Sequence, residues 1–316
     1  MNPVAITGAV EMGLIFALLA MGIYVNYRVL GVADLTVEGS FTMGAAVSAV
    51  FVLAGRPLLG MGVAILAGAA AGLCAAFLQT KMRVQPILAG ILVMTALYSV
   101  NLFFMDGRPN IALLQAHTLF TGMGEALGGM RIAHVRLERI LLPFIFTVGA
   151  GGLLCVFFHT RLGLSVRATG DNEAMVRASS INSALTKSVG LGIGNAAAAL
   201  SGALLAQYQF FADINMGFGM VVVALASLIV GETLLGRLGE ILFGRRIVIW
   251  DIAAVIAGAI VYRLILAFAL SFRFDPANLR AISALVVTAA ISYPVVKGRW
   301  VLFNLKRKAR KAGGHA

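Results

Sequence analysis

The sequence predicts an all-α polytopic membrane protein with eight or nine transmembrane helices, in two inverted repeats of about four helices joined by a linking helix. Of the 316 residues, 60% are hydrophobic and only 12% are charged, against about 45–50% and about 25% in typical soluble domains. The mean hydropathy is +0.95. A soluble domain of this size needs far more polar surface, which excludes most soluble enzymes.

Nine stretches are long and apolar enough, or nearly so, to cross a bilayer, which takes roughly 20 helical residues. The second and ninth are short, and each could be a tilted, broken or re-entrant piece. The polar, glycine-containing residues 106–139 are expected to form an extracytoplasmic loop. The nine stretches are residues 6–27, 37–54, 58–78, 86–105, 140–158, 187–207, 218–236, 247–270 and 280–296.

The distribution of Lys and Arg predicts the orientation. The tail, residues 297–316, carries seven of the cations and no acid, so we place it in the cytoplasm, where anionic lipid attracts it. Parity then puts the basic loops 79–85, 159–187 and 237–246 inside and the N-terminus outside, in the cell (inner) membrane. If the second span does not cross, the N-terminus lies inside. The tail lacks interleaved stacking aromatics, so we expect no nucleic-acid partner.

A short internal repeat supports the division into two halves. Ala33-Asp34-Leu35-Thr36-Val37 is echoed by Ala212-Asp213-Ile214-Asn215-Met216, and each patch follows a long span and precedes a small-residue-rich one. The spans before the patches cross in opposite directions, as in inverted-repeat transporters. We therefore predict repeats at 1–105 and 187–296 with 140–158 as the linking span. The alternative is that both patches are ordinary helix caps.

Polar side chains within the predicted spans indicate a path through the protein, because such groups are costly in lipid and usually face the bundle interior. In the sixth span, Ser188, Asn195, Gly202 and Gln209 recur every seven residues and form one stripe. The alternative for Asn195 is a structural hydrogen bond to a neighbouring helix. The path candidates are Thr36, Glu38, Ser40, Asn101, Asn195, Gln209 and Asn215.

Catalytic and metal-binding patterns are missing from the sequence. The four histidines have no metal-ligand spacing, and Cys74 and Cys155 lie in apolar runs. There is no GxSxG, HExxH or GxxxxGK[ST] motif, so the chain has no Walker A loop for ATP phosphates. We expect neither an enzyme nor a bound metal or cofactor.

The segment from Arg161 to Gly190 is too polar to cross the membrane and too orderly for a linker. Asp171 and Asn172 can N-cap a short helix that has Glu173 in its first turn and that Asn182 could end. Its apolar side, Ala174, Met175, Val176 and Ala178, would suit a partner's groove. The alternative is an interfacial helix that lies in lipid.

This segment also carries a family resemblance. The run ATGDNEAMVRASSIN, followed by ALSGALLAQYQ, resembles the membrane subunits of ABC importers of the branched-chain amino acid and ribose type. FADINMGFGMVVVALASLIVGETLLG and VADLTVEGSFTMGAA resemble a branch with members implicated in tryptophan and tyrosine uptake. Together these motifs span most of residues 10–295.

The resemblance implies a type II ABC importer-like fold, a homodimer of permease subunits, a pair of cytoplasmic ATPases that hold ATP and magnesium, and an extracytoplasmic substrate-binding protein. Arg108, Arg131, Arg136 and Arg139 would dock the binding protein, or would simply form a solvated surface. The coupling helix that docks on the ATPase would comprise Gly170, Asp171, Asn172, Glu173, Ala174, Met175, Val176, Arg177, Ala178, Ser179 and Ser180.

The implied solute is amino acid-like, aromatic or branched-chain, with a nucleoside or a sugar as the alternative. A different class of function is an ATPase-independent secondary transporter or channel with Glu38 or Glu232 as its titrating group. An intramembrane enzyme is the third class, and the lack of paired catalytic groups disfavours it.

Two positions depart from the family pattern. Ser180 stands where relatives commonly have Gly before Ile-Asn, and Phe210 stands where they commonly have Gly before Phe-Ala-Asp. The first could stiffen the end of the coupling helix. The second puts a ring where a glycine would let another group approach closely, so the resemblance does not imply a substrate role for this turn.

Overall fold

The computed structural model describes residues 3–128, 131–132, 135–236 and 248–271, together with positions 288 and 292. It is a bundle of long helices, and seven of the described ones are long and apolar enough to cross a membrane. These are α1 (Pro3–Ile23) with its π-helical continuation η1 (Tyr24–Val29), α2 (Thr36–Leu53), α3 (Pro57–Thr80), α4 (Pro86–Phe104), α6 (Leu137–His159), α9 (Ser183–Gln209) and α12 (Val248–Ser271).

These helices confirm the predicted all-α polytopic fold. The seventh predicted span, 218–236, is shorter than expected: α10 (Met220–Gly231) continues as the π-helical η2 (Glu232–Gly236). Helix α10 starts late because Gly219 adopts a left-handed conformation with φ of 78°, which breaks a helix and suits glycine. The ninth predicted span, the loop 237–246 and the basic tail lie outside the described residues, apart from positions 288 and 292.

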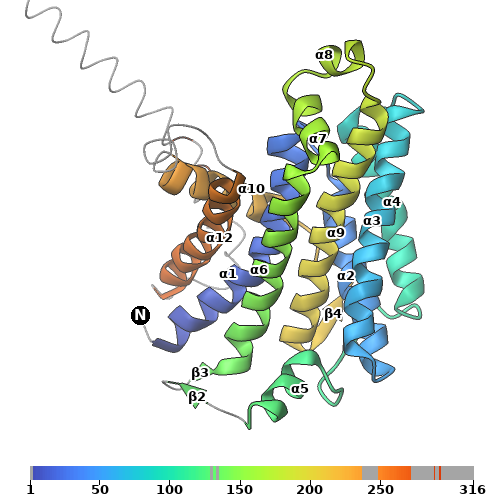
Figure 1. Ribbon diagram of the computed structural model, residues 1–316. Coiled ribbons are helices and arrows are strands. Elements are labelled where there is room, and N and C mark those ends of the chain that lie inside the picture. The colour runs from blue at the N-terminus through green and yellow to red at the C-terminus, as the bar shows by residue number, and fades with distance from the viewer. Residues whose placement is uncertain are drawn as a thin grey trace, which may run out of the picture.

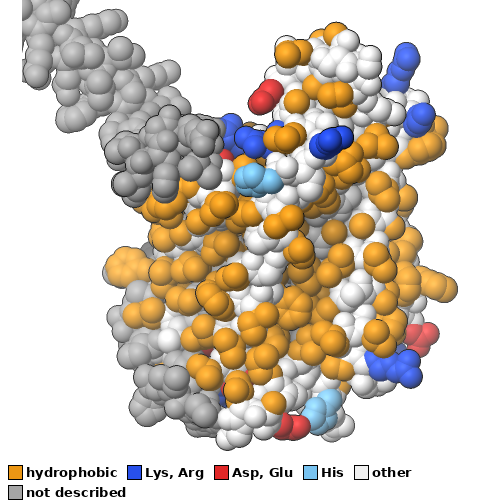
Figure 2. Space-filling model, viewed as in Figure 1, with side chains coloured by type: hydrophobic (Ala, Val, Ile, Leu, Met, Phe, Trp, Pro, Cys, Tyr) orange, Lys and Arg blue, Asp and Glu red, His pale blue; other side chains and the backbone are white. Residues whose placement is uncertain are grey.

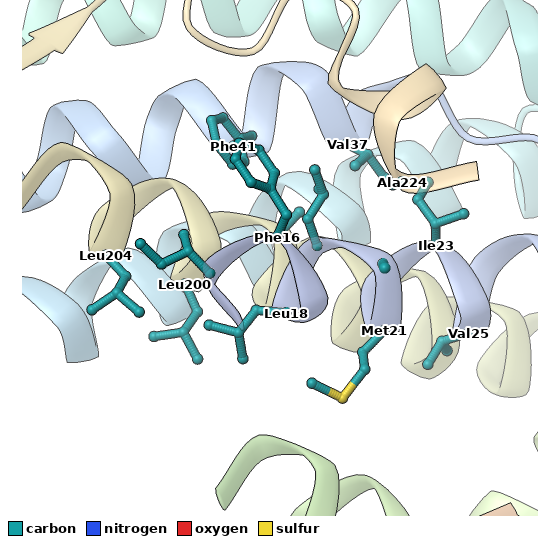
Figure 3. Close-up of a cluster of buried hydrophobic side chains, with 14 of the residues drawn as sticks. Phe16, Leu18, Met21, Ile23, Val25, Val37, Phe41, Leu200, Leu204 and Ala224 are labelled. Carbon is teal, nitrogen blue, oxygen red and sulfur yellow. The ribbon is translucent and has the colours of Figure 1, made fainter. Parts of the chain in front are cut away.

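Helix α9 lies at the centre of the bundle, packed against α1, α2 and α3 (Figure 1). In its most apolar window 78% of the residues are buried, as they are in α2, against 28% in α4 and α6. The core joins Phe16 of α1, Phe41 of α2 and Leu200 of α9 (Figure 3). In lipid such side chains stabilise the bundle through close packing rather than through removal of apolar surface from water.

Small residues let α9 approach its neighbours closely. A Cβ atom added to Gly202 would collide with the Phe41 carbonyl of α2. A Cβ atom added to Gly44 of α2 would collide with the backbone of Ala199. The small-residue pattern predicted such packing, which is common between helices in lipid.

The described residues of the polar loop 106–139 form short strands and a helix. Strand β1 (Asn110–Ala112) pairs antiparallel with β4 (Phe211–Asp213), which follows α9, with Ile111 opposite Ala212. Helix α5 (Leu119–Ala126) and the short strands β2 (Arg131–Ile132) and β3 (Val135–Arg136) complete the loop. The next helix, α6, begins at Leu137, three residues before the predicted linking span.

The two ends of the bundle differ. Helix α7 (Arg161–Asp171) and the short α8 (Glu173–Ala178) project from one end, whereas α5, β2 and β3 lie at the opposite end (Figure 1). Hydrophobic side chains cover the middle of the face in Figure 2, and charged side chains gather toward both ends. This distribution suits a bundle whose middle is surrounded by lipid.

Candidate functional site

The predicted coupling helix is α8 with its flanks. The Asn172 side chain accepts a hydrogen bond of 3.0 Å from the Met175 amide, which confirms the predicted N-cap, while Asp171 is the last residue of α7. The end of the helix was predicted wrongly: α8 stops at Ala178. Asn182 instead caps α9, accepting from the amides of Ala184 and Leu185 at 3.1 and 3.2 Å.

Helix α8 presents one side to solvent and anchors the other. Met175 is 68% exposed, whereas Val176 is only 4% exposed. Gly170 and Glu173 are half-buried. The other predicted coupling residues are exposed: Asp171, Asn172, Ala174, Arg177, Ala178, Ser179 and Ser180.

Charged bonds tie α8 to the start of α9. The Glu173 carboxylate lies 2.7 Å from Lys187 Nζ and 2.6 Å from an Arg177 guanidinium nitrogen. Arg177 Nε also donates to Ser183 Oγ at 3.0 Å. The hydrogen bond from Lys187, followed by the charges of Lys187 and Arg177, lowers the pKa of Glu173 below its usual value against the opposing effect of burial. These bonds connect α8 directly to the first two turns of α9.

Midway along α9, Asn195 is fully buried and joins three segments. Its Nδ2 donates to Asp34 Oδ2 at 2.7 Å, and its Oδ1 accepts from Ser40 Oγ at 2.7 Å. Asn26 of η1 also donates to Asp34, at 3.0 Å. These bonds match the structural alternative for Asn195, and a contact with solute stays a prediction.

A cavity of about 250 Å³ opens between α2, α4 and the segment after β4. It brings together three predicted path residues, Glu38, Asn101 and Asn215, from three separate elements. Of the other path candidates, Thr36 and Ser40 are fully buried beside α9 and Gln209 is half-buried at its end. The remaining lining residues are Gly39, Thr42, Met94, Thr95, Tyr98, Ile214, Gly217 and Phe218.

Glu38 links the two halves of the chain at this cavity. Its Oε1 accepts from the amides of Gly219 and Val221, at 3.0 and 3.4 Å, at the start of α10. Thr42 Oγ1 accepts from the Gly217 amide at 3.0 Å. A carboxylate at a helix N-terminus is favoured by the unpaired amides there.

The path prediction left out Met94, Tyr98 and Phe218. Met94 and Tyr98 share a helix face with Asn101, at a spacing of four and then three residues, which is a usable signal. Phe218 carries no such signal, because a turn rather than a helix positions it.

The two repeat patches form the same local structure. Asp34 Oδ1 accepts from the Thr36 amide at 2.9 Å, and Asp213 Oδ1 accepts from the Asn215 amide at 2.8 Å. Both are Asx turns. The first turn lies directly before α2, whose N-cap is Leu35 and has no side-chain cap bond, whereas the second lies well before α10, which begins only at Met220. The shared turn thus favours the repeat, which remains a prediction.

The four predicted docking arginines are in the loop at the end opposite α8 (Figure 1). Arg108 is exposed and lies 3.8 Å from Asp106. Arg136 is exposed, while the Arg139 guanidinium is half-buried over the Tyr208 ring, 5.6 Å from its centroid. Arg131 is in β2, and its side chain lies outside the described part.

Within the described residues, no group of three or more His, Cys, Asp or Glu could hold a metal ion. The two family departures, Ser180 and Phe210, both have φ of 59°, a left-handed conformation that glycine adopts more easily. This explains why a glycine suits both positions.

Comparison with known proteins agrees with this architecture. The chain is similar to the tyrosine transport system permease protein of Clostridioides difficile, with 35% identity over 91% of this chain and 90% of the relative. An uncharacterized protein of Rickettsia prowazekii is 34% identical over 90% of this chain and 95% of its own length. The ribose import permease protein RbsC of Escherichia coli is 28% identical over 71% of this chain and 68% of its own.

No solved structure matches the chain. The family described as branched-chain amino acid transport system / permease component matches residues 5–291. With seven membrane-length helices, the long central α9 and near full-length relatives, this chain belongs to that family and is a multi-pass membrane permease component of an ABC-type transport system.

Proposed function

We propose that the chain is the translocation subunit of an importer in the cell (inner) membrane, with a cytoplasmic C-terminus, for an amino acid-like solute. Two copies would pair, an ATPase pair that binds ATP and magnesium would dock at α8, and a substrate-binding protein would deliver solute at the opposite end. The connection of the exposed α8 to the central α9 through Glu173 and Lys187 carries this proposal.

Helix α8 is where the ATPase would dock. Met175 exposes an apolar side chain on one side of α8, whose other side is anchored through Val176 and Glu173. A rigid, partly apolar helix at one end of a membrane bundle suits a groove on a partner. Hydrolysis belongs to that partner in this proposal, since the sequence has no Walker A motif.

A chain of polar contacts links α8 to α9 and α9 to α2. A movement of α8 displaces the start of α9 through Lys187 and Ser183. Further along α9, Asn195 is bonded to Ser40 of α2 and to Asp34 just before α2. Helix α2 also carries Glu38, which holds the start of α10 at the cavity. The ATPase cycle would thus reshape the cavity and alternate its access.

The cavity around Glu38 would form part of the solute path. Glu38 is half-buried beside α4, in whose most apolar window only 28% of the residues are buried. A carboxylate that faced lipid at this depth would be costly, so we place this face on the path between two copies of the chain. Amides, hydroxyls and rings around one carboxylate suit an amino acid, consistent with the tyrosine permease relative. A sugar, as the ribose permease relative would suggest, is the alternative.

Docking is tested by co-purification of the permease with its ATPase. Met175→Asp puts a charge on the exposed side of α8, and we expect it to reduce ATPase capture at least tenfold. Leu114→Asp is the matched control, because Leu114 is 80% exposed in the loop that lies at the other end of the bundle. Equal capture by both variants would contradict docking at α8.

The path is tested by uptake into proteoliposomes that contain the complete transporter. Glu38→Gln keeps an acceptor for the α10 amides but removes the charge, so we expect a normal ATPase complex with uptake reduced at least tenfold. Asp106→Asn, at an exposed site in the loop, should leave uptake unchanged. Uptake that persists without any ATPase and stops when the proton gradient collapses would instead establish a secondary transporter.

A further inference from the structure

A second cavity, of about 430 Å³, lies between α5, the start of α6 and the end of α9, at the end of the bundle opposite α8. It is separate from the path cavity and shares no lining residue with it. Its lining combines three aromatic rings with two acidic and two basic side chains. One cavity therefore offers apolar contacts together with charges of both signs.

A buried carboxylate in this cavity lacks a full set of partners. Glu138 is only 6% exposed. Within the described part of the chain, its Oε2 atom has no hydrogen-bond partner. Buried carboxylate oxygens are normally paired, because an unpaired one costs free energy. An ammonium group that enters the cavity would supply the missing partner.

A basic group lies on the same wall. Arg139, the next residue of α6, is half-buried with its guanidinium over the Tyr208 ring. No ion pair joins Arg139 or Arg136 to Glu138 among the described residues. Arginine binds carboxylates in a planar, two-point geometry. The cavity thus offers an acid and a base that do not neutralise each other.

The aromatic wall is held in place. Phe120 is 4% exposed and packs edge-on against Tyr208, with 5.6 Å between ring centroids. The Tyr208 hydroxyl donates to Glu11 at 2.6 Å, which fixes the ring from the far side. Phe210 adds a third ring. Ordered rings favour a flat apolar or aromatic group between them.

We propose that this cavity is a binding site for a zwitterionic amino acid with an aromatic or large apolar side chain. Glu138 receives the α-ammonium group, Arg139 receives the α-carboxylate, and Phe120, Tyr208 and Phe210 contact the side chain. The site lies on the side where the proposed function has solute arrive, so it acts as an entrance site before the path cavity. The choice of side rests on the proposed function, whereas the binding chemistry does not.

The test measures equilibrium binding to the complete transporter in lipid nanodiscs without ATP. The probes are L-tyrosine, tyramine, which lacks the carboxylate, 3-(4-hydroxyphenyl)propionate, which lacks the ammonium group, and ribose. We expect saturable binding of L-tyrosine, with tyramine and the propionate at least tenfold weaker and ribose not bound. Equal affinity for tyramine and L-tyrosine would overturn the role of Arg139, and ribose binding would overturn the ligand class.

Four variants locate the site. Glu138→Gln should weaken L-tyrosine binding at least tenfold. Gly124→Val should weaken it at least tenfold by filling part of the cavity, because the three atoms nearest to a Cβ added at Gly124 all belong to the Glu138 side chain, at 3.4–3.6 Å, and none of them is backbone. Asp106→Asn, at an exposed site that lines neither cavity, should leave it unchanged, and Glu38→Gln is measured beside it to report on the path cavity. Gly124→Val keeps the test decisive if Glu138→Gln fails to fold.

The outcomes separate this inference from the proposed function. If Glu38→Gln but neither Glu138→Gln nor Gly124→Val weakens binding, the amino acid site is the path cavity and the inference is wrong. If the two cavity variants leave L-tyrosine bound but lose capture of the substrate-binding protein, the cavity is a protein-docking socket and the inference is wrong as well. Neither measurement depends on ATP-driven uptake. The binding result can therefore be interpreted even if the proposed importer function is wrong.

Discussion

Asn195 Nδ2 donates a hydrogen bond of 2.7 Å to Asp34 Oδ2, and this bond joins the middle of α9 to the segment that precedes α2. Both side chains are buried, and Asp34 also accepts from Asn26 and from the Thr36 amide. The carboxylate is thus surrounded by donors, which is how a buried charge is stabilised. Asp34 and Asn195 occupy the two predicted repeats.

Removal of the amide at this junction should destabilise the permease. We expect Asn195→Ala to lower stability by about 2–3 kcal/mol, because it leaves a buried carboxylate short of a donor. The measurement is the thermal unfolding midpoint of the purified permease in nanodiscs. Gln209→Ala, half-buried in the same seven-residue stripe, should change the midpoint little. If the two substitutions lower the midpoint equally, the bond between Asn195 and Asp34 adds no stability beyond that of a half-buried polar side chain.

The close approach of α9 to α2 predicts a contrast between two glycines of one helix. Gly202→Ala places a methyl group against the Phe41 carbonyl, which is backbone and cannot move aside. We expect a loss of about 1–3 kcal/mol, the usual cost of overpacking. Gly192→Ala meets its nearest atoms at 3.7 Å, so it should be tolerated or gain up to about 1 kcal/mol from helix propensity.

The same thermal unfolding assay checks this pair. The two substitutions are chemically identical and lie ten residues apart in α9, so they share any effect on helix propensity. A Gly202→Ala variant as stable as Gly192→Ala would mean that α2 and α9 are not in close contact at this level.

The sequence predicts this fold well where lipid itself imposes the pattern. Membrane-length apolar runs predict spans because the bilayer demands them, and the Asn172 cap was readable because capping is local. The late start of α10 was not readable, since it depends on Gly219 and on Glu38, which lies far away in the sequence. The strands β1 and β4 have only three residues each, too few for a periodic signal.

Some residues of the candidate site could be predicted from the sequence and others could not. Glu38, Asn101 and Asn215 stand out as polar residues within or beside apolar spans, so they were predicted. The cavity that gathers them also needs Phe218, which a turn positions and which looks like an ordinary apolar residue in the sequence. Tyr98 shares a helix face with Asn101 and was within reach of sequence reasoning. The partners of Asn195 were not predictable either, because the register between α9 and α2 is a tertiary property.

The left-handed backbone at Ser180 predicts a stabilising substitution. A non-glycine residue in this conformation costs about 1–2 kcal/mol, so Ser180→Gly should raise the unfolding midpoint by an amount that corresponds to part of that cost. Ser179→Gly is the matched control: Ser179 has φ of −85°, and glycine there should be neutral or destabilising. A gain from Ser179→Gly as large as from Ser180→Gly would contradict the strain argument.

Phe210 has the same φ of 59° but a different expected outcome. Its side chain packs against the smaller core cluster around Ile111 and Ala212, so Phe210→Gly loses apolar contacts as it relieves strain. The two terms oppose each other, since burial of such a ring contributes about 1.5–3 kcal/mol. We expect Phe210→Gly to be destabilising or close to neutral in the same assay, and a clear gain would show that the ring contributes little.

The ion pairs of Glu173 predict a pH dependence in the acid range. Lys187 and Arg177 lower the pKa of Glu173 in the folded protein, so the unfolded chain takes up this proton more readily. The pairs therefore stabilise the fold above the unfolded pKa of about 4.3, and this contribution is lost as the pH falls through the folded pKa.

Glu173→Gln should lower stability by up to about 1 kcal/mol at pH 7 and by progressively less below about pH 4. Unfolding midpoints of both proteins between pH 7 and pH 3 measure the difference, with Asp171→Asn, exposed at the end of α7, as the control. A gap between wild type and Glu173→Gln that stays constant over this range would show that the carboxylate acts through shape rather than charge.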